Sequence, residues 1–439
     1  MIRRIDGRGK DTEWIMHSLK KRFQPEAFEE SQTVLSILKK VREDGDDALL
    51  YYTEKFDGVK FSGSADLQVT VDEIQEAYES LKKTDPGFLA ILEKAARRIR
   101  KFHEKQRQES WISFDEPGIV LGRKVTPMER VGVYVPGGKA AYPSSVLMNV
   151  IPAQAAGVNE IIMVTPPGKN GKPALSILAA AKVAGVTRIY RIGGAQAIAA
   201  LAYGTQTVPK VDKIVGPGNI YVALAKKEVY GSVDIDMIAG PSEILIIADN
   251  SAQPSYIAAD LMSQAEHDPM ASAMLVTDSE KIIDGVMQEL KRQMEKQPLK
   301  NTICESLQNY GACILVDSID EAVKISNAIA PEHLELSIVN PAEKLADIRN
   351  AGAIFLGHYT PEPVGDYMAG PNHVLPTGGT ARFFSPLETG DFVKKSSIIS
   401  YNKQALSRIY KEVAEFARME GLPAHASSVE IRFGEQAEK

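Results

Sequence analysis

From about Arg130 onward, short apolar runs rich in β-branched residues alternate with Gly/Pro loops and Ala-rich stretches of helix length. A strand, a loop and a helix recur about every 25 to 30 residues, which is typical of parallel α/β sheets. We therefore expect an α/β fold with a parallel sheet built from the first runs and a second sheet built from the later ones. The strand candidates of the first series are RVGVYV, EIIMVT, RIYRIG, DKIVG and EILIIAD, and those of the second are SAMLVTD, ACILVDS and GAIFLG.

The first 115 residues follow the helical period instead. In VDEIQEAYESLKK the apolar residues Ile74 and Leu81 fall on one face, and Asp85 followed by Pro86 is a typical helix start before FLAILEKAARRIRKFHEKQRQ. His103 lies among lysines and arginines in this second helix, so we expect it to be solvated. The region is predicted to be a helical scaffold.

Beyond about Phe384 the pattern fades into a short irregular piece and a final helix, ALSRIYKEVAEFARMEG. Such a tail is too small to fold alone. We expect it to pack on another part of the molecule or on a second subunit.

The composition is that of an ordinary globular protein. The chain has 439 residues, 44% hydrophobic and 25% charged, which is enough for two or three domains. A net charge of -6 and a pI near 5.8 argue against a nucleic-acid partner. The N-terminus lacks the apolar core of a secretion signal and no eighteen apolar residues run together, so we expect a cytoplasmic protein without membrane contact.

The stretch SQAEHDP is a candidate metal site. Gln264 and His267 are three residues apart at the end of the apolar-periodic segment YIAADLM, so they should project from one helix face. An imidazole and an amide oxygen side by side can hold a divalent metal if other residues complete the set. Taken alone, the stretch favours the simpler alternative of a polar helix end capped by Asp268 and stopped by Pro269.

Three loops follow predicted strands of the first series and open helices. GPGN, at Gly216 to Asn219, lets the backbone approach a phosphate, and two similar arrangements offer Tyr134 and Gln196 at the mouth of the sheet. No full GxGxxG fingerprint is present. Each glycine pair can also be a tight turn without a ligand.

APEHLEL presents a carboxylate beside an imidazole. The preceding helix must stop at Pro331, so Glu332 and His333 are expected at a loop-to-strand junction. Two such groups can serve as a proton-transfer pair if their pKa values are set apart. The alternative is a surface turn.

The segment Pro363 to Leu387 is long, Gly-rich and irregular, which is typical of a functional loop. Either Asp366 or His373 could be a metal ligand there, and spacing does not choose between them. In the tail, EGLPAH places Glu420 and His425 just past the last predicted helix, where a simple C-terminal cap is the alternative.

Taken together, these motifs resemble the histidinol dehydrogenase family. The resemblance covers nearly the whole chain. It implies NAD-dependent, four-electron oxidation of L-histidinol to L-histidine through L-histidinal, the last steps of histidine biosynthesis, with a bound Zn²⁺ and a homodimer that shares its active sites. The motifs, in order, are VGVYVPGGKAAYPSSVLMN, GGAQAIAALAYGT, VGPGNIYVALAK, IDMIAGPSEILIIAD, SQAEHDP, APEHLEL, GDYMAGPNHVLPTGGTARFFSPL and EGLPAH.

The resemblance assigns roles by position. It implies zinc ligands at Gln264, His267 and Asp366, with His425 as a fourth ligand that the family takes from the partner subunit. It implies Glu332 and His333 as the catalytic pair. Substrate contacts are implied for Ser242, Glu420, the four metal ligands and the catalytic pair, and dinucleotide contacts for Tyr134, Gln196 and Asn219. His373 has no implied role, and we expect it to be structural.

The implied architecture is two incomplete Rossmann-like parallel-sheet domains with a helical N-terminal segment and small, dimer-swapped C-terminal extensions. The first domain is interrupted by the second. The expected parts are 1–133 and 242–386 for the substrate and zinc domain, 134–241 for the NAD-side domain, 387–409 for a linking segment and 410–439 for the helical tail.

The cysteine content limits which group can attack the aldehyde intermediate. Cys304 and Cys313 lie in no metal or redox motif, and Cys313 is expected to be a buried strand residue, so water must attack the aldehyde. We expect His333 to remove the hydroxyl proton and Glu332 to activate water. Two rivals are a zinc hydrolase that uses the same residues without a dinucleotide, and a homologue that binds ligands without turnover.

Overall fold

The structure is a computed structural model, and it describes residues 2–19, 28–137 and 141–434. The chain divides into two compact units. The first comprises Met1–Gln106 with Met128–Phe392, and the second comprises Arg107–Pro127 with Val393–Lys439. The first unit contains two six-stranded sheets, which confirms the two predicted sheets but adds strands that the sequence does not predict.

One sheet of the first unit has the strand order β2-β7-β6-β5-β8-β9. Four of the predicted runs form its strands and pair in parallel, which confirms them. The short β2 pairs antiparallel with β7 at the edge. The strands are β2 (Gln68–Val69), β5 (Arg130–Tyr134), β6 (Glu160–Val164), β7 (Arg188–Tyr190), β8 (Lys213–Val215) and β9 (Asp234–Ile235).

Helices cover both faces of this sheet. The two buried clusters that they form with alternate strand residues are separate, because successive side chains of a strand point to opposite faces. One face packs against α4 (Val71–Thr84), α5 (Pro86–His103), α6 (Pro143–Ala156) and α7 (Leu175–Ala184). The other packs against α2 (Phe28–Asp44), α3 (Asp46–Asp57), α8 (Gly194–Tyr203) and α9 (Ile220–Val229).

The predicted N-terminal helices α4 and α5 form as expected. Thr70 and Glu73 make a capping box at the start of α4, and Asp85 caps α5 with Pro86 in its first turn. The expectation for His103 is wrong, because its side chain is buried and its Nδ1 lies 2.6 Å from Gln106 Oε1. Burial lowers the pKa of His103.

The second sheet is parallel throughout, with the order β1-β12-β11-β10-β13-β14. Two expectations change here. The run EILIIAD belongs to this sheet, and the N-terminal region is not wholly helical, because RRID adds β1 at the edge. That strand is short and has Ile5 as its one apolar residue, so it lacks an apolar run. The strands are β1 (Arg3–Asp6), β10 (Glu243–Ala248), β11 (Ser272–Thr277), β12 (Ala312–Leu315), β13 (His333–Ser337) and β14 (Ala353–Leu356).

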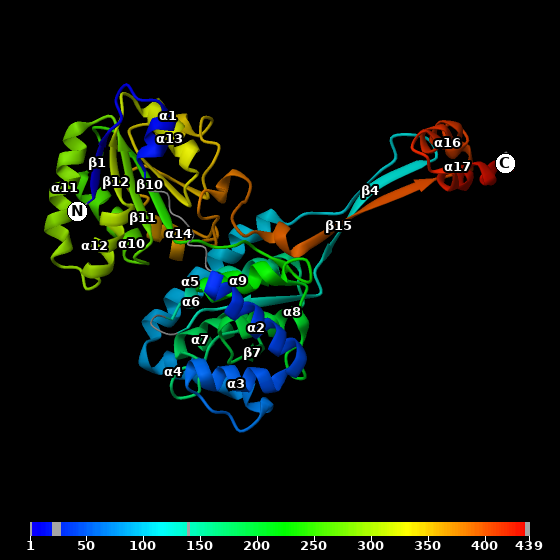
Figure 1. Cartoon of the computed structure of the whole chain (residues 1–439), viewed down its shortest axis with the longest axis horizontal. Helices are drawn as coiled ribbons and strands as arrows, with labels where there is room; N and C mark the ends of the chain where they lie inside the picture. The colour runs from blue at the N-terminus through cyan, green and yellow to red at the C-terminus, as the bar shows by residue number, and fades with distance from the viewer. Residues whose placement is uncertain (1, 20–27, 138–140, 435–439) are drawn as a thin grey trace. The chain divides into compact units, whose positions relative to one another are not determined.

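Figure 1 shows α11 and α12 on one side of this sheet and α1 and α13 on the other. The buried cluster around α1 and α13 includes Leu334 and Leu336 of β13. Because strand side chains alternate, His333 and Glu335 face the opposite side, which is covered by α10. The helices are α1 (Thr12–Ser18), α10 (Pro254–Ala265), α11 (Glu280–Met294), α12 (Lys300–Tyr310) and α13 (Ile319–Ile329).

Short elements complete the first unit. The helix α14 (Glu362–Tyr367) lies at the start of the predicted irregular loop. Cys313 is buried in β12, as expected, and both cysteines are free thiols. The 3-10 turns are Ser64–Leu67, Glu104–Gln106, Pro341–Lys344, Thr380–Arg382 and Thr389–Phe392.

The second unit is an antiparallel sheet of order β15-β4-β3 followed by helices. The predicted final helix forms over Tyr410–Met419, but it is not the single helix expected, since two further helices and a 3-10 turn flank it. After α15, the Ser407 hydroxyl donates to the carbonyl of Gln404, a local bond that competes with a continuing helix. The elements are β3 (Trp111–Ser113), β4 (Ile119–Pro127), β15 (Val393–Tyr401), α15 (Lys403–Leu406), α16 (Tyr410–Met419), α17 (Pro423–Glu430) and a 3-10 turn at Ile431–Phe433.

In the part of the chain that the structure describes, every helix is too short or too polar to cross a bilayer.

Candidate active site

The candidate catalytic pair lies at the amino-terminal edge of the second sheet, where β10 and β13 begin. The register places Ile244 beside His333. Ser242 and Glu332, which come just before β10 and β13, therefore lie at the same edge of the sheet. Ligands of parallel sheets usually lie at the carboxyl edge, so this placement is not what a strand pattern alone would indicate.

A sharp turn after α13 delivers these residues. The helix ends at Ile329, and Ala330 has a left-handed φ of 54°, a strained value for a residue with a side chain. The next strand approaches closely at Gly352, where a Cβ would lie 2.5 Å from the Glu332 carbonyl oxygen. The predicted loop-to-strand junction at Pro331 is confirmed.

Glu332 is buried against the backbone of the neighbouring strand. Its Oε2 accepts the N–H of Glu243 at 2.9 Å, and Glu243 Oε2 accepts the N–H of Glu332 at 3.3 Å. Burial, reinforced by the Glu243 carboxyl group, raises the pKa of Glu332 well above its usual value. A carboxyl group with a raised pKa is a stronger proton acceptor than an ordinary glutamate.

His333 is held in one tautomer. Its Nδ1 lies 2.9 Å from the carbonyl oxygen of Glu243, and since a carbonyl can only accept, Nδ1 carries the hydrogen. Its Nε2 is buried without a hydrogen-bond partner among the residues described. Burial lowers the pKa of His333 to about 4, so the ring is neutral at pH 7 with a free lone pair on Nε2.

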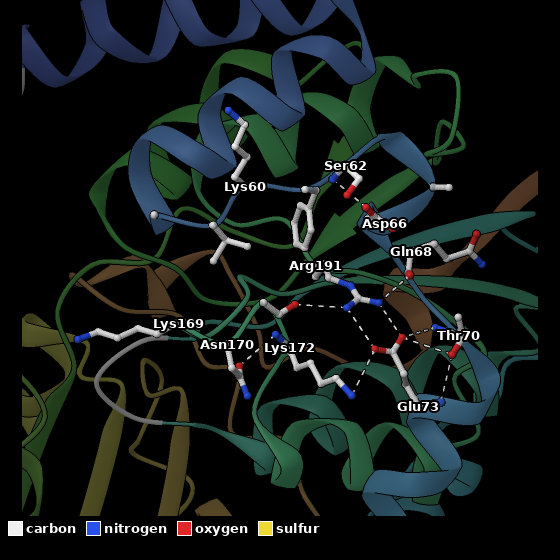
Figure 2. A pocket seen from close by; sticks show the side chains of 15 residues that line it. Lys60, Ser62, Asp66, Gln68, Thr70, Glu73, Lys169, Asn170, Lys172 and Arg191 are labelled. Carbon is white, nitrogen blue, oxygen red and sulfur yellow. Dashed lines mark hydrogen bonds and ion pairs between the residues drawn. The ribbon is translucent and has the colours of Figure 1, made fainter.

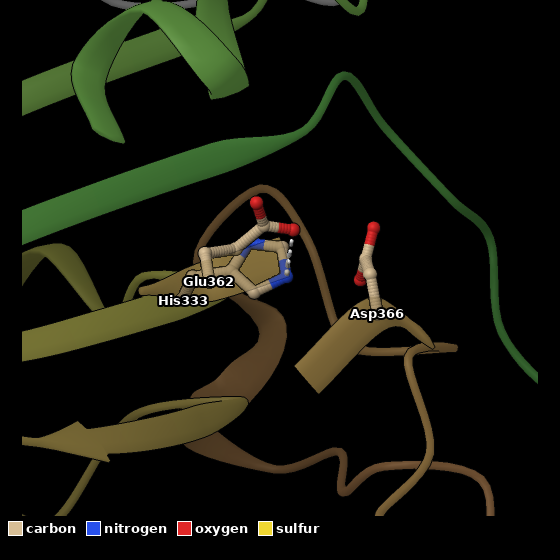
Figure 3. Close-up of side chains that lie close together, drawn as sticks. All are labelled: His333, Glu362 and Asp366. Atoms are coloured by element: carbon tan, nitrogen blue, oxygen red, sulfur yellow. Dashed lines mark ion pairs between the residues drawn. The ribbon is translucent and has the colours of Figure 1, made fainter. Parts of the chain in front are cut away.

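Two acidic side chains from α14 face this imidazole (Figure 3). Glu362 Oε1 lies 3.7 Å from His333 Nε2, and ligand atoms of His333, Glu362 and Asp366 all lie within 4.8 Å of one another. Burial raises the pKa of Glu362 to about 9, with Asp366 as a further cause. Such a cluster of one nitrogen and two carboxyl groups could hold a metal ion.

Gln264 is the second-last residue of α10, and His267 lies two residues past the end of that helix. The helix ends at Ala265, so His267 follows it in a turn rather than continuing the predicted helix face, and its N–H donates to the Gln264 carbonyl at 3.3 Å. Both side-chain polar atoms of Gln264 are buried, and neither has a partner within the described chain. His267 interacts electrostatically with both His333 and His373.

His373 lies beside Asp366, with 3.8 Å between His373 Nδ1 and Asp366 Oδ1. Burial lowers its pKa, which keeps the ring neutral. The structure therefore brings Asp366 and His373, the two residues between which sequence spacing could not choose, into contact with one another.

Glu420 and His425 belong to the second unit. Both are exposed there. Glu420 follows the last residue of α16 as its C-cap, whereas His425 lies inside α17 rather than past the last helix, so that part of the prediction is wrong.

The predicted dinucleotide contacts lie at the carboxyl edge of the first sheet. Tyr134 ends β5, and its hydroxyl accepts the N–H of Gly194 at 3.2 Å; burial raises its pKa to about 12. Gln196 is buried in the first turn of α8, and its Oε1 has no hydrogen-bond partner in the described ranges. Asn219 is exposed and caps α9 by accepting the N–H of Val222.

A buried ion pair fixes the GPGN loop beside Tyr134. Lys226 binds Asp236, and its Nζ also donates to the Gly216 carbonyl at 3.0 Å. Asp236 Oδ2 accepts the N–H of Gly216 at 2.8 Å. Gly216 has a φ of 114°, and a Cβ there would lie 2.1 Å from the Tyr134 carbonyl oxygen. Glycine is therefore required where this loop passes β5.

A wide pocket of about 710 Å³ opens elsewhere on this sheet, around Arg191 (Figure 2). The Arg191 guanidinium binds the Glu73 carboxylate at 2.6 Å and the Gln68 carbonyl at 2.9 Å. Lys60 and Lys169 extend away from this centre at its edges (Figure 2). Because Glu73 already neutralises Arg191, this network joins the segment 58–73 to β7 and is not a prepared anion site.

Sequence reasoning missed Glu243 and Glu362. Glu362 stands four residues before Asp366 in PEPVGDY, a spacing that puts both on one face only if a helix forms there. Glu243 lies in the motif AGPSE, and a carboxylate that starts a wholly apolar strand was a usable signal.

The fold and this cluster define an α/β enzyme with a buried imidazole and carboxyl groups at the edge of a parallel sheet. The family model described as histidinol dehydrogenase matches residues 20–433. The chain is 56% identical to histidinol dehydrogenase of Clostridium acetobutylicum over 433 residues, 99% of each chain, and 57% identical to that of Geobacter sulfurreducens over 405 residues, 92% of this chain and 93% of the relative. The chain belongs to the histidinol dehydrogenase family.

A solved structure agrees with this assignment. The crystal structure of histidinol dehydrogenase from Elizabethkingia anophelis matches with a TM-score of 0.93 and 37% identity, and the match covers 99% of this chain and 98% of that one. The resemblance drawn from the eight motifs is confirmed. The family comprises oxidoreductases of histidine biosynthesis that use NAD and Zn²⁺.

Proposed function

We propose that this chain oxidises L-histidinol to L-histidine through L-histidinal, with one hydride transferred to NAD in each of two steps. The observation that carries the proposal is His333, a buried neutral imidazole with Nδ1 fixed and Nε2 free, next to a buried carboxyl group. In the first step the alcohol loses a hydride and a proton. In the second the aldehyde takes up water, then loses a hydride and two protons to give the carboxylate.

His333 acts as the base of the first step. Its Nδ1–H bond to the Glu243 carbonyl orients the ring and stabilises the imidazolium that forms when Nε2 takes the hydroxyl proton. Glu362 lies 3.7 Å from Nε2, but its pKa of about 9 keeps it protonated at pH 7, so it places no negative charge beside that imidazolium.

Glu332 acts as the base of the second step. Its carboxylate removes a proton from water as the water oxygen attacks the aldehyde carbon, while the imidazolium of His333 returns the proton of the first step to the aldehyde oxygen. Neutral His333 then takes a hydroxyl proton of the resulting gem-diol when the second hydride leaves to NAD. The raised pKa of Glu332 suits this role because its carboxylate is a stronger proton acceptor than that of an ordinary glutamate.

Gln264, His267 and Asp366 would hold the zinc ion, and His425 of the partner subunit would complete the set. The residues present fit a cation, since the buried Gln264 amide has no hydrogen-bond partner in the described residues and Asp366 lies beside His333 and Glu362. When bound, zinc would orient substrate nitrogens and polarise the reacting oxygen. We assign His333 to proton transfer rather than to the metal because its Nε2 is unprotonated and has no hydrogen-bond partner among the described residues.

The remaining assignments follow the same proposal. Ser242 and Glu420 contact the substrate, together with Gln264, His267, Glu332, His333, Asp366 and His425. Tyr134, Gln196 and Asn219 contact NAD, and their place at the carboxyl edge of a parallel sheet supports this. His373 is structural. The domain limits 1–133 with 242–386, 134–241, 387–409 and 410–439 stay a prediction.

The proposal predicts two NADH per L-histidinol consumed, only when metal is present. The measurement is the ratio of NADH to substrate on chelator-treated protein and again after zinc is restored. One NADH per substrate would mean that the aldehyde escapes and would contradict the role of Glu332. No NADH in either state would contradict the proposal, and metal-dependent hydrolysis in its place would favour the zinc hydrolase.

We also propose a homodimer in which each site is completed by the partner. The second unit exposes large apolar side chains, with Phe416 at 68%, Met419 at 85% and Ile431 at 71%. Exposed apolar surface of this kind marks a contact site. Glu420 and His425 lie on the same helical segment as these residues, so contact through it would carry both to another subunit.

Mixed dimers test this sharing. Glu332→Gln and His425→Ala are each expected to be inactive in the complete reaction. If His425 acts across the interface, co-expression should restore about a quarter of wild-type activity, because half of randomly paired dimers then hold one intact site. The activity of the co-expressed mixture is one measurement, and separately tagged chains purified as heterodimers are a second, for which about half of wild-type activity is expected. Activity that stays at the level of the single variants would show that His425 serves its own subunit.

A cytoplasmic location is proposed on the free thiols of Cys304 and Cys313, which are typical of a reducing compartment.

A further inference from the structure

Glu335 is a buried acid in the middle of β13, between Leu334 and Leu336. Two residues after His333, its side chain shares that residue's face of the strand and points to the side covered by α10. A carboxyl group in the centre of a parallel sheet is costly unless its oxygens are hydrogen-bonded. Its partners therefore indicate what it holds in place.

The first partner is the start of α14. Glu335 Oε1 accepts the backbone N–H of Glu362 at 2.7 Å. The residue before this helix, Pro361, provides no side-chain cap. Glu335 thus supplies from another strand the acceptor that the first turn of α14 lacks. This helix carries Glu362 and Asp366.

The second partner is α10. The carboxyl groups of Glu335 and Asp260 form a hydrogen bond with one another, which requires that one of them keeps a proton. Asp260 lies one helical turn before Gln264 on α10. Because burial is the main cause, the pKa of Asp260 is raised to about 6, and that of Glu335 is raised well above its usual value.

We propose that Glu335 is a positioning residue that fixes the metal ligands by tying α10 to α14 across the strand that carries His333. This rests on the proposed function, in which Gln264 and Asp366 are zinc ligands. The Glu335 carboxyl group bonds to both α10, which carries Gln264, and α14, which carries Asp366. It contacts neither the substrate nor the metal. Loss of this tie would let the two ligands separate and would weaken zinc binding before it unfolds the protein.

Two substitutions of Glu335 distinguish the loss of its hydrogen bonds from the loss of its volume. Glu335→Gln keeps both bonds, because the amide oxygen accepts the Glu362 N–H and the amide nitrogen donates to an ionised Asp260. Glu335→Leu has a similar volume and makes neither bond. Asp260→Ala releases α10 alone. Leu336→Ala is a matched control, since it removes buried volume from the opposite face of the same strand.

Zinc affinity, measured by competition with a chromophoric chelator, and the visible spectrum of the Co²⁺-substituted protein are the readouts. We expect Glu335→Leu to weaken zinc binding about 10- to 100-fold and to alter the Co²⁺ spectrum, as loss of outer-shell support does elsewhere. Asp260→Ala should shift both readouts in the same direction. Glu335→Gln should match wild type, and Leu336→Ala should lower the melting temperature with wild-type zinc affinity.

Wild-type zinc affinity and spectrum in Glu335→Leu would overturn the inference, as would an equal loss of affinity in Leu336→Ala. If Glu335→Leu does not fold, Asp260→Ala decides, because wild-type affinity there would show that α10 is not held by this tie. The same titration distinguishes failure of this inference from failure of the proposed function. Wild-type protein that binds no zinc would contradict the proposed function itself, before any variant is compared.

Discussion

Replacement of Glu332 by glutamine is expected to slow oxidation of L-histidinal by about 10²- to 10⁴-fold, the usual contribution of a general base, while the protein stays folded. The glutamine oxygen can still accept the N–H of Glu243, so the contact between β10 and the start of β13 is kept. What is lost is the ability to take a proton from water. Oxidation of L-histidinol to the aldehyde depends on His333 and should fall less.

Single-turnover measurements on the two half-reactions check this. L-histidinol and L-histidinal are supplied separately, and NADH formation is followed at equal enzyme and NAD concentrations. Glu343→Gln, an exposed acid in a 3-10 turn of the same unit, is the control and should behave as wild type. Equal loss in both half-reactions would contradict the division of labour between Glu332 and His333.

Much of the fold could be predicted because a buried parallel strand consists of a nearly continuous apolar run between turn residues. Eight such runs became strands, and the helix that must end before Pro331 does so. β1 could not be predicted in the same way, since this edge strand, RRID, has one apolar residue among three charged ones and lacks the apolar run. The antiparallel β4 and β15 were missed because none of their residues is buried, so no alternation of buried and exposed positions marks them.

The candidate site shows a second limit. Gln264, Glu332, His333 and Asp366 could be named from motifs, but not the groups that hold them. Glu335 is an acid in a run of apolar residues, and its purpose becomes visible only when the N–H of Glu362 and the Asp260 carboxyl group meet it. Such contacts join residues 27 positions apart or more, and local periodicity carries no information about them.

Replacement of Lys226 by methionine is expected to reduce the free energy of local unfolding around β8 and α9 by about 3 to 5 kcal/mol, the cost of leaving a buried charge unpaired. The side chains of Lys226 and Asp236 are only 3% and 1% exposed, so water cannot replace the lost partner. The change should also raise the KM for NAD, because the pair fixes Gly216 and thereby the loop that ends at Asn219.

Hydrogen exchange of peptides from β8 and α9, with α11 of the other sheet as internal reference, measures this. Lys213→Met is the matched control. Its partner Asp234 is 42% exposed, so water can solvate the remaining carboxylate and the cost should be about 1 kcal/mol or less. Adding Asp236→Asn to Lys226→Met should recover part of the loss, since the amide oxygen still accepts the Gly216 N–H and no charge is left buried. If the double variant is less stable than Lys226→Met, packing around the lysine stem rather than the unpaired carboxylate sets the stability of the loop.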